Sequence, residues 1–334
     1  MHAIELRAPS IDALRPVLKA NPVPQPGEVL VRLRASALNF VDLAVATGNF
    51  SVPGFPLIPV ADGAGEVAAL GPGVTALKTG DRVIPHFMPF WQGGPITHAN
   101  SAGMRGVSLP GSLADYVAVP ERSVVPMPEH LEFAEAAALP IAGTTAWRAL
   151  RAADVRPDSS VALLGTGGVS VMALQLAKAS GATVIVTSSS DEKLARARDF
   201  GADVTINYRS VPEWDSQILE ETGGKGADLV IETGGGGTFA RSLNAAAFGG
   251  VVFSIGFLSG TTSSVSLMHI IVKALRIQGN NTGPVASFSD AIRAIAAHRI
   301  KPVIGACYGM DEAPSAYRLL ASGAQPFGKI VFVH

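Results

Sequence analysis

The chain contains a single cysteine, Cys307, among its 334 residues. One cysteine excludes an intramolecular disulfide and any zinc site built from several cysteines. The formal net charge is −1 and no long basic run occurs, so neither nucleic acid nor an anionic membrane is expected as a partner. No apolar run approaches the length of a membrane span, and the N-terminal residues lack a signal-peptide pattern. We therefore expect a soluble, cytoplasmic protein.

The N-terminal part, residues 1–128, is rich in valine, proline and glycine and predicts a compact, barrel-like β domain. Its strand-like runs are residues 29–33, 65–70, 82–85 and 116–119. A stretch with glycine, proline, serine and embedded aromatic residues follows at 86–112, and a loop of that length is usually functional or disordered.

Residues 129–280 change to alternating strands and helices, which predicts a parallel sheet covered by helices on both faces. The predicted strands are 161–164, 183–187, 203–207, 227–232, 250–255 and 275–279, and helices are expected between most of them. Residues 281–334 carry one clear helix (288–298) and a last strand (329–333). These segments are too few to form a domain, so we expect them to complete the first one.

A glycine-rich turn follows the first strand of this second domain, in the sequence V-A-L-L-G-T-G-G-V-S at 161–170. Gly165 and Gly167 turn the chain from a buried strand into a helix whose first backbone N–H groups remain unpaired. A pyrophosphate fits there because no Cβ blocks its approach. Ser170 departs from the usual third glycine but is small enough for close packing of helix on strand.

The tip of the next strand carries Thr187 and Ser188, where an NAD site usually places an acidic residue. Hydroxyl groups can donate to a 2′-phosphate that an acid would repel, and Lys193 adds a positive charge nearby. We therefore expect NADP(H) as the cofactor. The alternative is that residues 188–191 merely cap the following helix.

Several motifs resemble the medium-chain dehydrogenase/reductase superfamily over essentially the whole chain. They are P-L-I-P-V-A-D-G-A-G-E-V (56–67), K-T-G-D-R-V-I (78–84), A-L-N-F-V-D-L (37–43), G-T-T-A-W (143–147), S-S-S-D-E-K-L (188–194), I-N-Y-R (206–209) and F-G-K-I-V (327–331). The resemblance is greatest to the zinc-free branch with the quinone oxidoreductases and bacterial alcohol-dehydrogenase-like reductases. It implies an α/β fold: a Rossmann-type doubly wound parallel sheet domain and a GroES-like β-barrel catalytic domain.

The departures from the zinc-dependent branch concern its metal ligands. Where that branch has its G-H-E motif this chain has Val60-Ala61-Asp62, so the ligand histidine is an alanine, and the first ligand cysteine corresponds to Asn39. Asp62, Glu66 and His86 offer alternative ligands, but nothing in their spacing recommends them. We therefore expect no functional metal.

Without a metal, developing negative charge on a substrate must be stabilised by hydrogen bonds. Alcohol oxidation also needs a group that removes the hydroxyl proton, and none of the four tyrosines is an evident pocket acid. Conjugate reduction needs only one or two donors, so we expect reduction of enones or quinones. The resemblance favours Asn39 and Thr145 as donors. Asn39 is alternatively a turn residue, and Asp42 either contacts substrate or caps a helix.

An apolar substrate cleft is predicted from aromatic residues on the long loop and after the strand 250–255. Alternatively, these rings form a small core of the loop itself, and His86 lies either in the pocket lining or in the core. In some quinone reductases a tyrosine occupies the position of Phe50, so that comparison weakens here. The expected pocket residues are Phe50, His86, Phe87, Phe90, Trp91 and Phe257.

For the cofactor, the resemblance implies contacts at the pyrophosphate, around the 2′-phosphate and over the nicotinamide. These residues are Thr145, Gly167, Gly168, Val169, Ser188, Ser189, Lys193, Tyr208, Ile255, Gly256 and Phe257. The resemblance also implies a homodimer through the edge strand near 274–280.

The sequence thus predicts a zinc-independent, NADPH-dependent oxidoreductase that transfers hydride to a quinone, an enone or another activated alkene or carbonyl compound. One alternative is a metal-free, NADP-dependent alcohol or ketone dehydrogenase. Another is a sensor or structural protein that binds NADPH without turnover.

Overall fold

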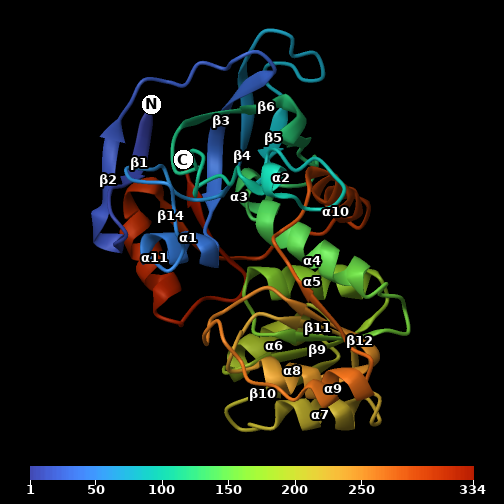
Figure 1. Cartoon of the computed structure of the whole chain (residues 1–334). Helices are drawn as coiled ribbons and strands as arrows, with labels where there is room; N and C mark the ends of the chain where they lie inside the picture. The colour runs from blue at the N-terminus through green and yellow to red at the C-terminus, as the bar shows by residue number, and fades with distance from the viewer. The chain divides into compact units, whose positions relative to one another are not determined.

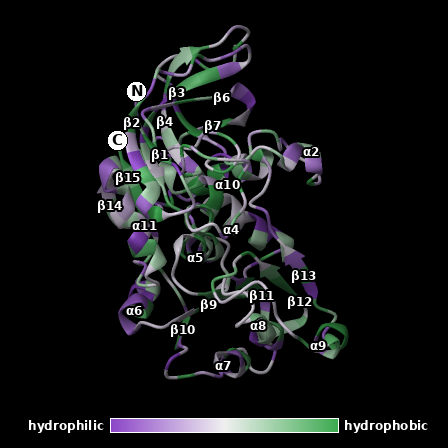
Figure 2. Cartoon of the chain, turned by 60° about the vertical axis from the view of Figure 1, so that its left-hand side comes forward, coloured by the Kyte–Doolittle hydropathy of each residue, from purple (hydrophilic) through white to green (hydrophobic).

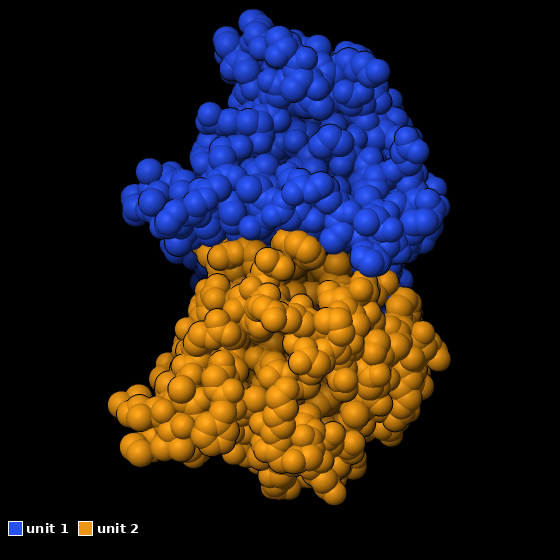
Figure 3. All heavy atoms as spheres, turned by 90° about the vertical axis from the view of Figure 1, so that its right-hand side faces the viewer, with its two compact units in different colours: residues 1–144, 283–334 blue, residues 145–282 orange.

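A computed structural model describes all 334 residues, and the chain folds into two compact units. Unit 1 comprises residues 1–144 and 283–334, and unit 2 comprises residues 145–282 (Figures 1 and 3). The first boundary therefore lies at residue 144 and not at residue 128 as predicted. The reason is local packing, because α3 (Phe133–Ala137) lies against β3 (Glu28–Ala37) and β4 (Asp62–Leu70) of unit 1.

Unit 2 is built on a six-stranded sheet in which every neighbouring pair is parallel, as predicted. The strand order is β10-β9-β8-β11-β12-β13, which is the doubly wound order. The chain adds strands toward one edge from β8 to β10 and toward the other edge from β11 to β13, so the topological switch point lies between β8 and β11. The strands are β8 (Ser160–Leu164), β9 (Thr183–Ser188), β10 (Val204–Asn207), β11 (Ala227–Glu232), β12 (Ala246–Ser254) and β13 (Arg276–Gly279).

Helices lie on both faces of this sheet (Figure 1). They are α5 (Gly168–Ala179), α6 (Asp191–Asp199), α7 (Trp214–Glu221), α8 (Phe239–Ala245) and α9 (Leu267–Val272), while α4 (Pro140–Ala152) crosses the boundary between the units. All five residues of β8 are buried, as expected of a central strand covered on both sides. Ligands of such sheets bind beyond the carboxyl ends of the strands, next to the reversal point.

Unit 1 contains a seven-stranded, mostly antiparallel sheet in the order β14-β15-β3-β4-β5-β7, with β6 paired to β3. The remaining strands of this sheet are β5 (Arg82–Pro85), β6 (Tyr116–Pro120), β7 (Val124–Pro126), β14 (Ile304–Gly309) and β15 (Lys329–Val333). A separate hairpin pairs β1 (His2–Leu6) with β2 (Leu14–Leu18). The predicted β domain is confirmed, and the last strand falls at the predicted residues.

Unit 1 also contains helices, of which only α2 lies in the long stretch 86–112. They are α1 (Phe40–Ala46), α2 (His98–Ser101), α3, α10 (Val285–Ala297) and α11 (Ala313–Ala321), with single 3₁₀ turns at Ile11–Ala13, Glu121–Ser123 and Met310–Glu312. The closing segment therefore holds two elements that the sequence analysis missed, β14 and α11. None of the helices has the length and apolar character needed to cross a membrane.

Candidate functional site

The turn between β8 and α5 leaves the start of the helix open. Gly165 has φ +76°, a conformation that favours glycine, and Gly167 precedes the helix with no side chain to cap it. Ser170 is buried and its Oγ donates to the carbonyl oxygen of Leu164 at 2.9 Å, which fixes the helix on the strand. The first backbone N–H groups of α5 therefore suit an anionic phosphate, and this turn fits the pyrophosphate of a dinucleotide.

The predicted 2′-phosphate residues of unit 2 lie around the tip of β9. Ser188 is paired with Asn207 in the sheet, and the backbone N–H of Tyr208 donates to the carbonyl oxygen of Ser188 at 3.1 Å. One of the two acids of this region is engaged, because Asp191 Oδ1 accepts a hydrogen bond from Asn207 Nδ2 at 2.8 Å. Ser190 caps α6 by accepting from the backbone N–H of Lys193, so the capping alternative also holds at this position.

A buried carboxylate organises the carboxyl ends of β11 and β12. Glu232 is fully buried, and its Oε1 accepts from the N–H groups of Gly234 and Gly235 at 2.6 and 2.9 Å. Its carbonyl oxygen accepts from the N–H groups of Ile255 and Gly256 at 2.9 and 3.3 Å. Glu232 thereby fixes the two residues predicted to close over the nicotinamide. Glu232 was not predicted, although an acid that directly follows the apolar run 229–231 was a usable signal.

Gly256 is required by this packing. A Cβ there would lie 2.0 Å from the carbonyl oxygen of Thr233, which is closer than any side chain tolerates. On the same edge of the sheet, Thr145 is buried and accepts a hydrogen bond from Asn280 Nδ2 at 3.4 Å. Thr145, the segment 255–256 and the β8–α5 turn thus all belong to unit 2.

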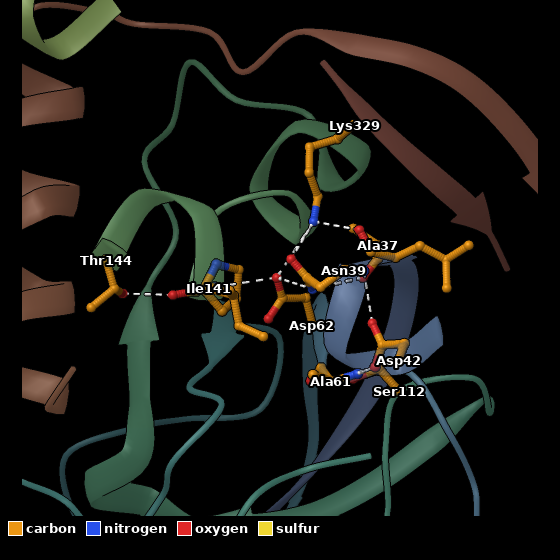
Figure 4. Close-up of polar contacts among 11 residues, drawn as sticks. Ala37, Asn39, Asp42, Ala61, Asp62, Ser112, Ile141, Thr144 and Lys329 are labelled. Atoms are coloured by element: carbon orange, nitrogen blue, oxygen red, sulfur yellow. Dashed lines mark hydrogen bonds and ion pairs between the residues drawn. The ribbon is translucent and has the colours of Figure 1, made fainter. Parts of the chain in front are cut away.

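Unit 1 holds a cluster of polar side chains in which Asp42, Asp62 and Lys329 are buried and Asn39 is half-buried (Figure 4). Asp42 closes the start of α1: its Oδ2 accepts from the backbone N–H of Asn39 at 2.7 Å and its Oδ1 from that of Ala61 at 2.9 Å. Both carboxylate oxygens are therefore committed to the backbone. This geometry supports the capping alternative for Asp42.

Both ends of the Asn39 side chain are also engaged. Its Nδ2 donates to Asp62 Oδ2 at 2.9 Å and to the carbonyl oxygen of Ala37 at 3.3 Å, and its Oδ1 accepts from Lys329 Nζ at 2.7 Å. A role of Asn39 as a substrate donor stays a prediction, and in this conformation its amide hydrogens already have acceptors. Lys329 was missed, although it begins the predicted last strand.

Burial sets the charge of these groups. Burial raises the pKa of Asp42 to about 7, against the hydrogen bond from the Asn39 backbone. Burial also raises the pKa of Asp62 to about 6, and the ammonium of Lys329 opposes this rise. The pKa of Lys329 is lowered by burial and supported by Asp62 and Asp42. The cluster is thus a coupled group of two acids and one base.

This cluster does not have the donor set of a catalytic zinc site. The ammonium of Lys329 lies 2.7 Å from Asn39 Oδ1 and 3.9 Å from Asp62 Oδ2, so a cation of the chain already faces both side-chain oxygens. Ala61 offers only backbone atoms. No group of three His, Cys, Asp or Glu side chains in the chain is arranged to hold a metal ion.

A buried arginine that was not predicted, Arg105, interacts electrostatically with Asp62 of this cluster. Arg105 Nη2 donates to Ser112 Oγ at 2.6 Å, and Ser112 Oγ donates to the carbonyl oxygen of Ala61 at 3.3 Å. Burial lowers the pKa of Arg105 to about 10, while Asp62 favours its charged form. Arg105 therefore adds a second fixed positive charge near Asp62.

The predicted pocket residues divide between core and surface. Phe87 and Trp91 are 3% and 2% exposed and belong to a hydrophobic core of unit 1 with Phe50 packed against it, whereas Phe90 is 42% exposed. His86 is fully buried: its Nδ1 accepts from the N–H of Met88 at 3.0 Å, and its ring lies 5.4 Å from that of Phe288. This placement favours a core role for His86, Phe87 and Trp91. Phe257 belongs to unit 2, and the predicted cleft stays a prediction.

Comparison with known proteins agrees with this architecture. Residues 25–129 match the model of the alcohol dehydrogenase GroES-like domain, and residues 168–297 match the model described as zinc-binding dehydrogenase. A zinc-type alcohol dehydrogenase-like protein of Schizosaccharomyces pombe is 39% identical over 320 residues, which cover 92% of each chain. A quinone oxidoreductase of Pseudomonas aeruginosa is 33% identical over 276 residues, 82% of this chain and 78% of that protein.

Solved structures lead to the same result. The crystal structure of a Sinorhizobium meliloti protein assigned as an alcohol dehydrogenase superposes with a TM-score of 0.92 at 38% identity and covers 100% of this chain and 98% of that one. A mycobacterial protein complexed with NADPH superposes with a TM-score of 0.84 at 26% identity over 100% of both chains. The chain therefore belongs to the medium-chain dehydrogenase/reductase superfamily, as an oxidoreductase of that superfamily.

Proposed function

We propose that this protein is a zinc-independent, NADPH-dependent reductase that transfers hydride to a quinone, an enone or another activated alkene or carbonyl compound. The observation that carries the proposal is the Lys329 ammonium, which pairs with Asn39 and Asp62 in the cluster where the zinc-dependent branch has its ligands. The chain therefore has a dinucleotide site at the open start of α5 and a polar cluster that does not suit a metal.

The choice of NADPH over NADH rests on the tip of β9. Thr187 and Ser188 end that strand, and the carboxylate of Asp191 is engaged by Asn207. A ribose 2′-phosphate at this tip would lie near hydroxyl groups, Lys193 and the exposed Tyr208. The solved relative that carries NADPH supports this choice.

The substrate class follows from the acid–base groups. Bound NADPH supplies the hydride, so the residues of this chain have to bind the acceptor and donate hydrogen bonds to its oxygen. Tyr317 does not suit proton exchange with the oxygen of an alcohol or ketone, because it is fully buried and burial raises the pKa of its hydroxyl. A conjugated acceptor needs no such acid, since water can protonate the product. The relative named quinone oxidoreductase supports this class.

A metal-free alcohol or ketone dehydrogenase is the second candidate. It is favoured by the name of the Sinorhizobium meliloti structure, which is assigned as an alcohol dehydrogenase and is 38% identical to this chain. Such an activity would require a base that accepts the alcohol proton. The carboxylate of Asp62 is the candidate, because with a pKa of about 6 it is ionised at neutral pH.

We also propose that two chains associate through β13, which is the unpaired edge strand of the unit 2 sheet. Exposed apolar residues gather along this edge and on α9, which is coloured as hydrophobic in Figure 2. Ile277 of β13 is 42% exposed, and Leu267, Met268, Ile271 and Val272 of α9 are each more than half exposed. The cytoplasm is the proposed location.

The proposed function is tested by NADPH oxidation with quinones, alkenals and cyclic enones, in parallel with NADH and with simple alcohols plus NADP⁺. We expect turnover of the conjugated acceptors with NADPH in clear preference to NADH, and identified products that are quinols or saturated carbonyl compounds. Turnover confined to alcohols and ketones would establish the second candidate. Tight NADPH binding with no turnover of any compound would indicate a sensor or structural protein.

A further inference from the structure

Three polar side chains of unit 2 form a directed chain of hydrogen bonds at the carboxyl ends of β12 and β13. Arg148 lies one turn after Thr145 on α4, and Asn280 follows directly after β13. Arg148 Nη1 donates to Asn280 Oδ1 at 2.8 Å, and Asn280 Nδ2 donates to Thr145 Oγ1 at 3.4 Å. The backbone of Asn280 is held as well, because its N–H donates to the carbonyl oxygen of Ser254 at 3.0 Å.

The arginine determines the direction of this chain. A guanidinium group has donors and no acceptor, so the oxygen of the Asn280 amide has to face Arg148. The amide nitrogen then faces Thr145, and the Thr145 oxygen accepts. Arg148 Nη1 also donates to the carbonyl oxygen of Thr282 at 3.2 Å, which fixes the guanidinium from a second side.

A threonine hydroxyl has a single hydrogen, and the bond from Asn280 uses a lone pair of the oxygen. The hydroxyl hydrogen of Thr145 therefore remains available to a further acceptor. Thr145 is 1% exposed, and a donor shielded from bulk solvent is stronger toward a ligand. Only an acceptor atom, such as a carbonyl or amide oxygen, complements it.

We propose that Arg148 and Asn280 are positioning residues that make Thr145 an obligate hydrogen-bond donor to a carbonyl or amide oxygen of the bound ligand. This inference rests on the proposed function and specifies it: Thr145 recognises an acceptor, either the amide oxygen of the nicotinamide or the carbonyl oxygen of the substrate. A ligand group that has only hydrogen-bond donors and no acceptor at this position would bind less well.

The decisive variant is Asn280→Asp. The new carboxylate keeps both oxygens as acceptors, so its bond with Arg148 is retained and becomes an ion pair. It has no hydrogen to donate, so Thr145 will turn its own hydrogen toward this carboxylate and no longer offer it to the ligand. We expect a melting temperature no lower than that of the parent protein, and a fivefold to tenfold loss, roughly the worth of one hydrogen bond, in ligand recognition.

Thr145→Val should show the same loss, and the double variant should lose no more than either single one because the same bond is removed. Thr145→Ser keeps the hydroxyl and should recover most of the loss. Asn281→Asp is the matched control, since it adds the same charge one residue away, at an exposed side chain. It should behave as the parent protein.

Two readouts separate the sources of the acceptor: the NADPH dissociation constant from fluorescence titration, and kcat/KM for the conjugated substrate. A loss in NADPH affinity assigns the nicotinamide amide, and a loss confined to kcat/KM assigns the substrate carbonyl. If the parent protein turns over and Asn280→Asp changes neither quantity, or if the two substitutions add, the inference fails while the proposed function stands. If the parent protein neither binds NADPH nor turns over, both fail.

Discussion

Buried titratable residues of unit 1 bind protons differently in the folded and the unfolded chain. The pKa values of Asp42 and Asp62 are raised from 3.8 to about 7 and about 6, so the folded chain holds more protons on these acids. Their contribution to stability is fully present at low pH and is lost as the pH rises through about 6 to 7. His86 acts in the opposite sense, because burial lowers its pKa from 6.5 to about 4.

His86→Phe isolates one of these contributions. The phenylalanine keeps a ring against Phe288 but cannot titrate. Between pH 6.5 and about 4 the unfolded chain protonates this histidine and the folded chain does not, so wild-type stability falls as the pH falls. We expect the variant to gain up to roughly 3 kcal/mol on the wild type between pH 7.5 and pH 4.5. Urea unfolding of both proteins at the two pH values measures it.

A constant offset between the two proteins at both pH values would contradict this prediction. It would mean that His86 has the same pKa in the folded and the unfolded chain. A constant loss from the missing hydrogen bond to the N–H of Met88 is expected on top of the pH-dependent difference.

Single residues were predictable where a local pattern determines them. Asp42 is three residues after Asn39, which is the spacing of a capping pair, so its capping role was one of two interpretations of the sequence. Arg105 and Lys329 were not predictable, because their burial depends on segments that are distant in the sequence. Arg105 lies in the long stretch 86–112, where no periodicity distinguishes a buried arginine from a solvated one.

At the scale of elements, five strands of unit 2 were predicted to within one residue at each end, whereas β12 begins at Ala246, four residues before the predicted start. The continuous apolar run of β8 is followed by turn residues, and its burial on both faces makes the pattern unambiguous. The missed strand β14 is rich in small residues and is only half-buried. The missed helix α11 begins with alanine and proline, yet it buries Ala313, Ala316, Tyr317 and Leu320 at helical spacing, which was a usable signal.

The edge strand β13 gives a prediction at this scale. Replacing Ile277 by lysine and Ile271 by glutamate in one protein would place charges on the exposed apolar edge of unit 2 and prevent the proposed pairing of two chains. We expect the wild type to sediment as a dimer and the double variant as a monomer with unchanged helix content. Val333→Lys, at a 49% exposed position in unit 1, is the control and should remain dimeric.

Sedimentation at micromolar concentration decides this question. A wild-type protein that sediments as a monomer would contradict the proposed association. A double variant that remains dimeric would show that the two chains meet elsewhere than at β13.

For the whole molecule, the sequence predicted both the class and the two-domain organisation. Motifs in a fixed order along the chain predicted the family, and the alternation of strands and helices predicted the parallel sheet. The domain boundary was misplaced, since α3 has helical sequence character but packs on the sheet of unit 1. Sequence patterns report the type of an element and not the surface on which it packs.

We propose that the reaction of this chain needs no zinc, because the ammonium of Lys329 faces Asn39, the position that corresponds to a ligand of the zinc-dependent branch. The measurement that tests it is the rate of NADPH-dependent reduction of a conjugated acceptor by chelator-treated protein whose metal content has been determined. We predict the same rate with and without added zinc, at a metal content far below one per chain. Loss of activity in proportion to the metal removed, with recovery on adding zinc, would contradict the claim.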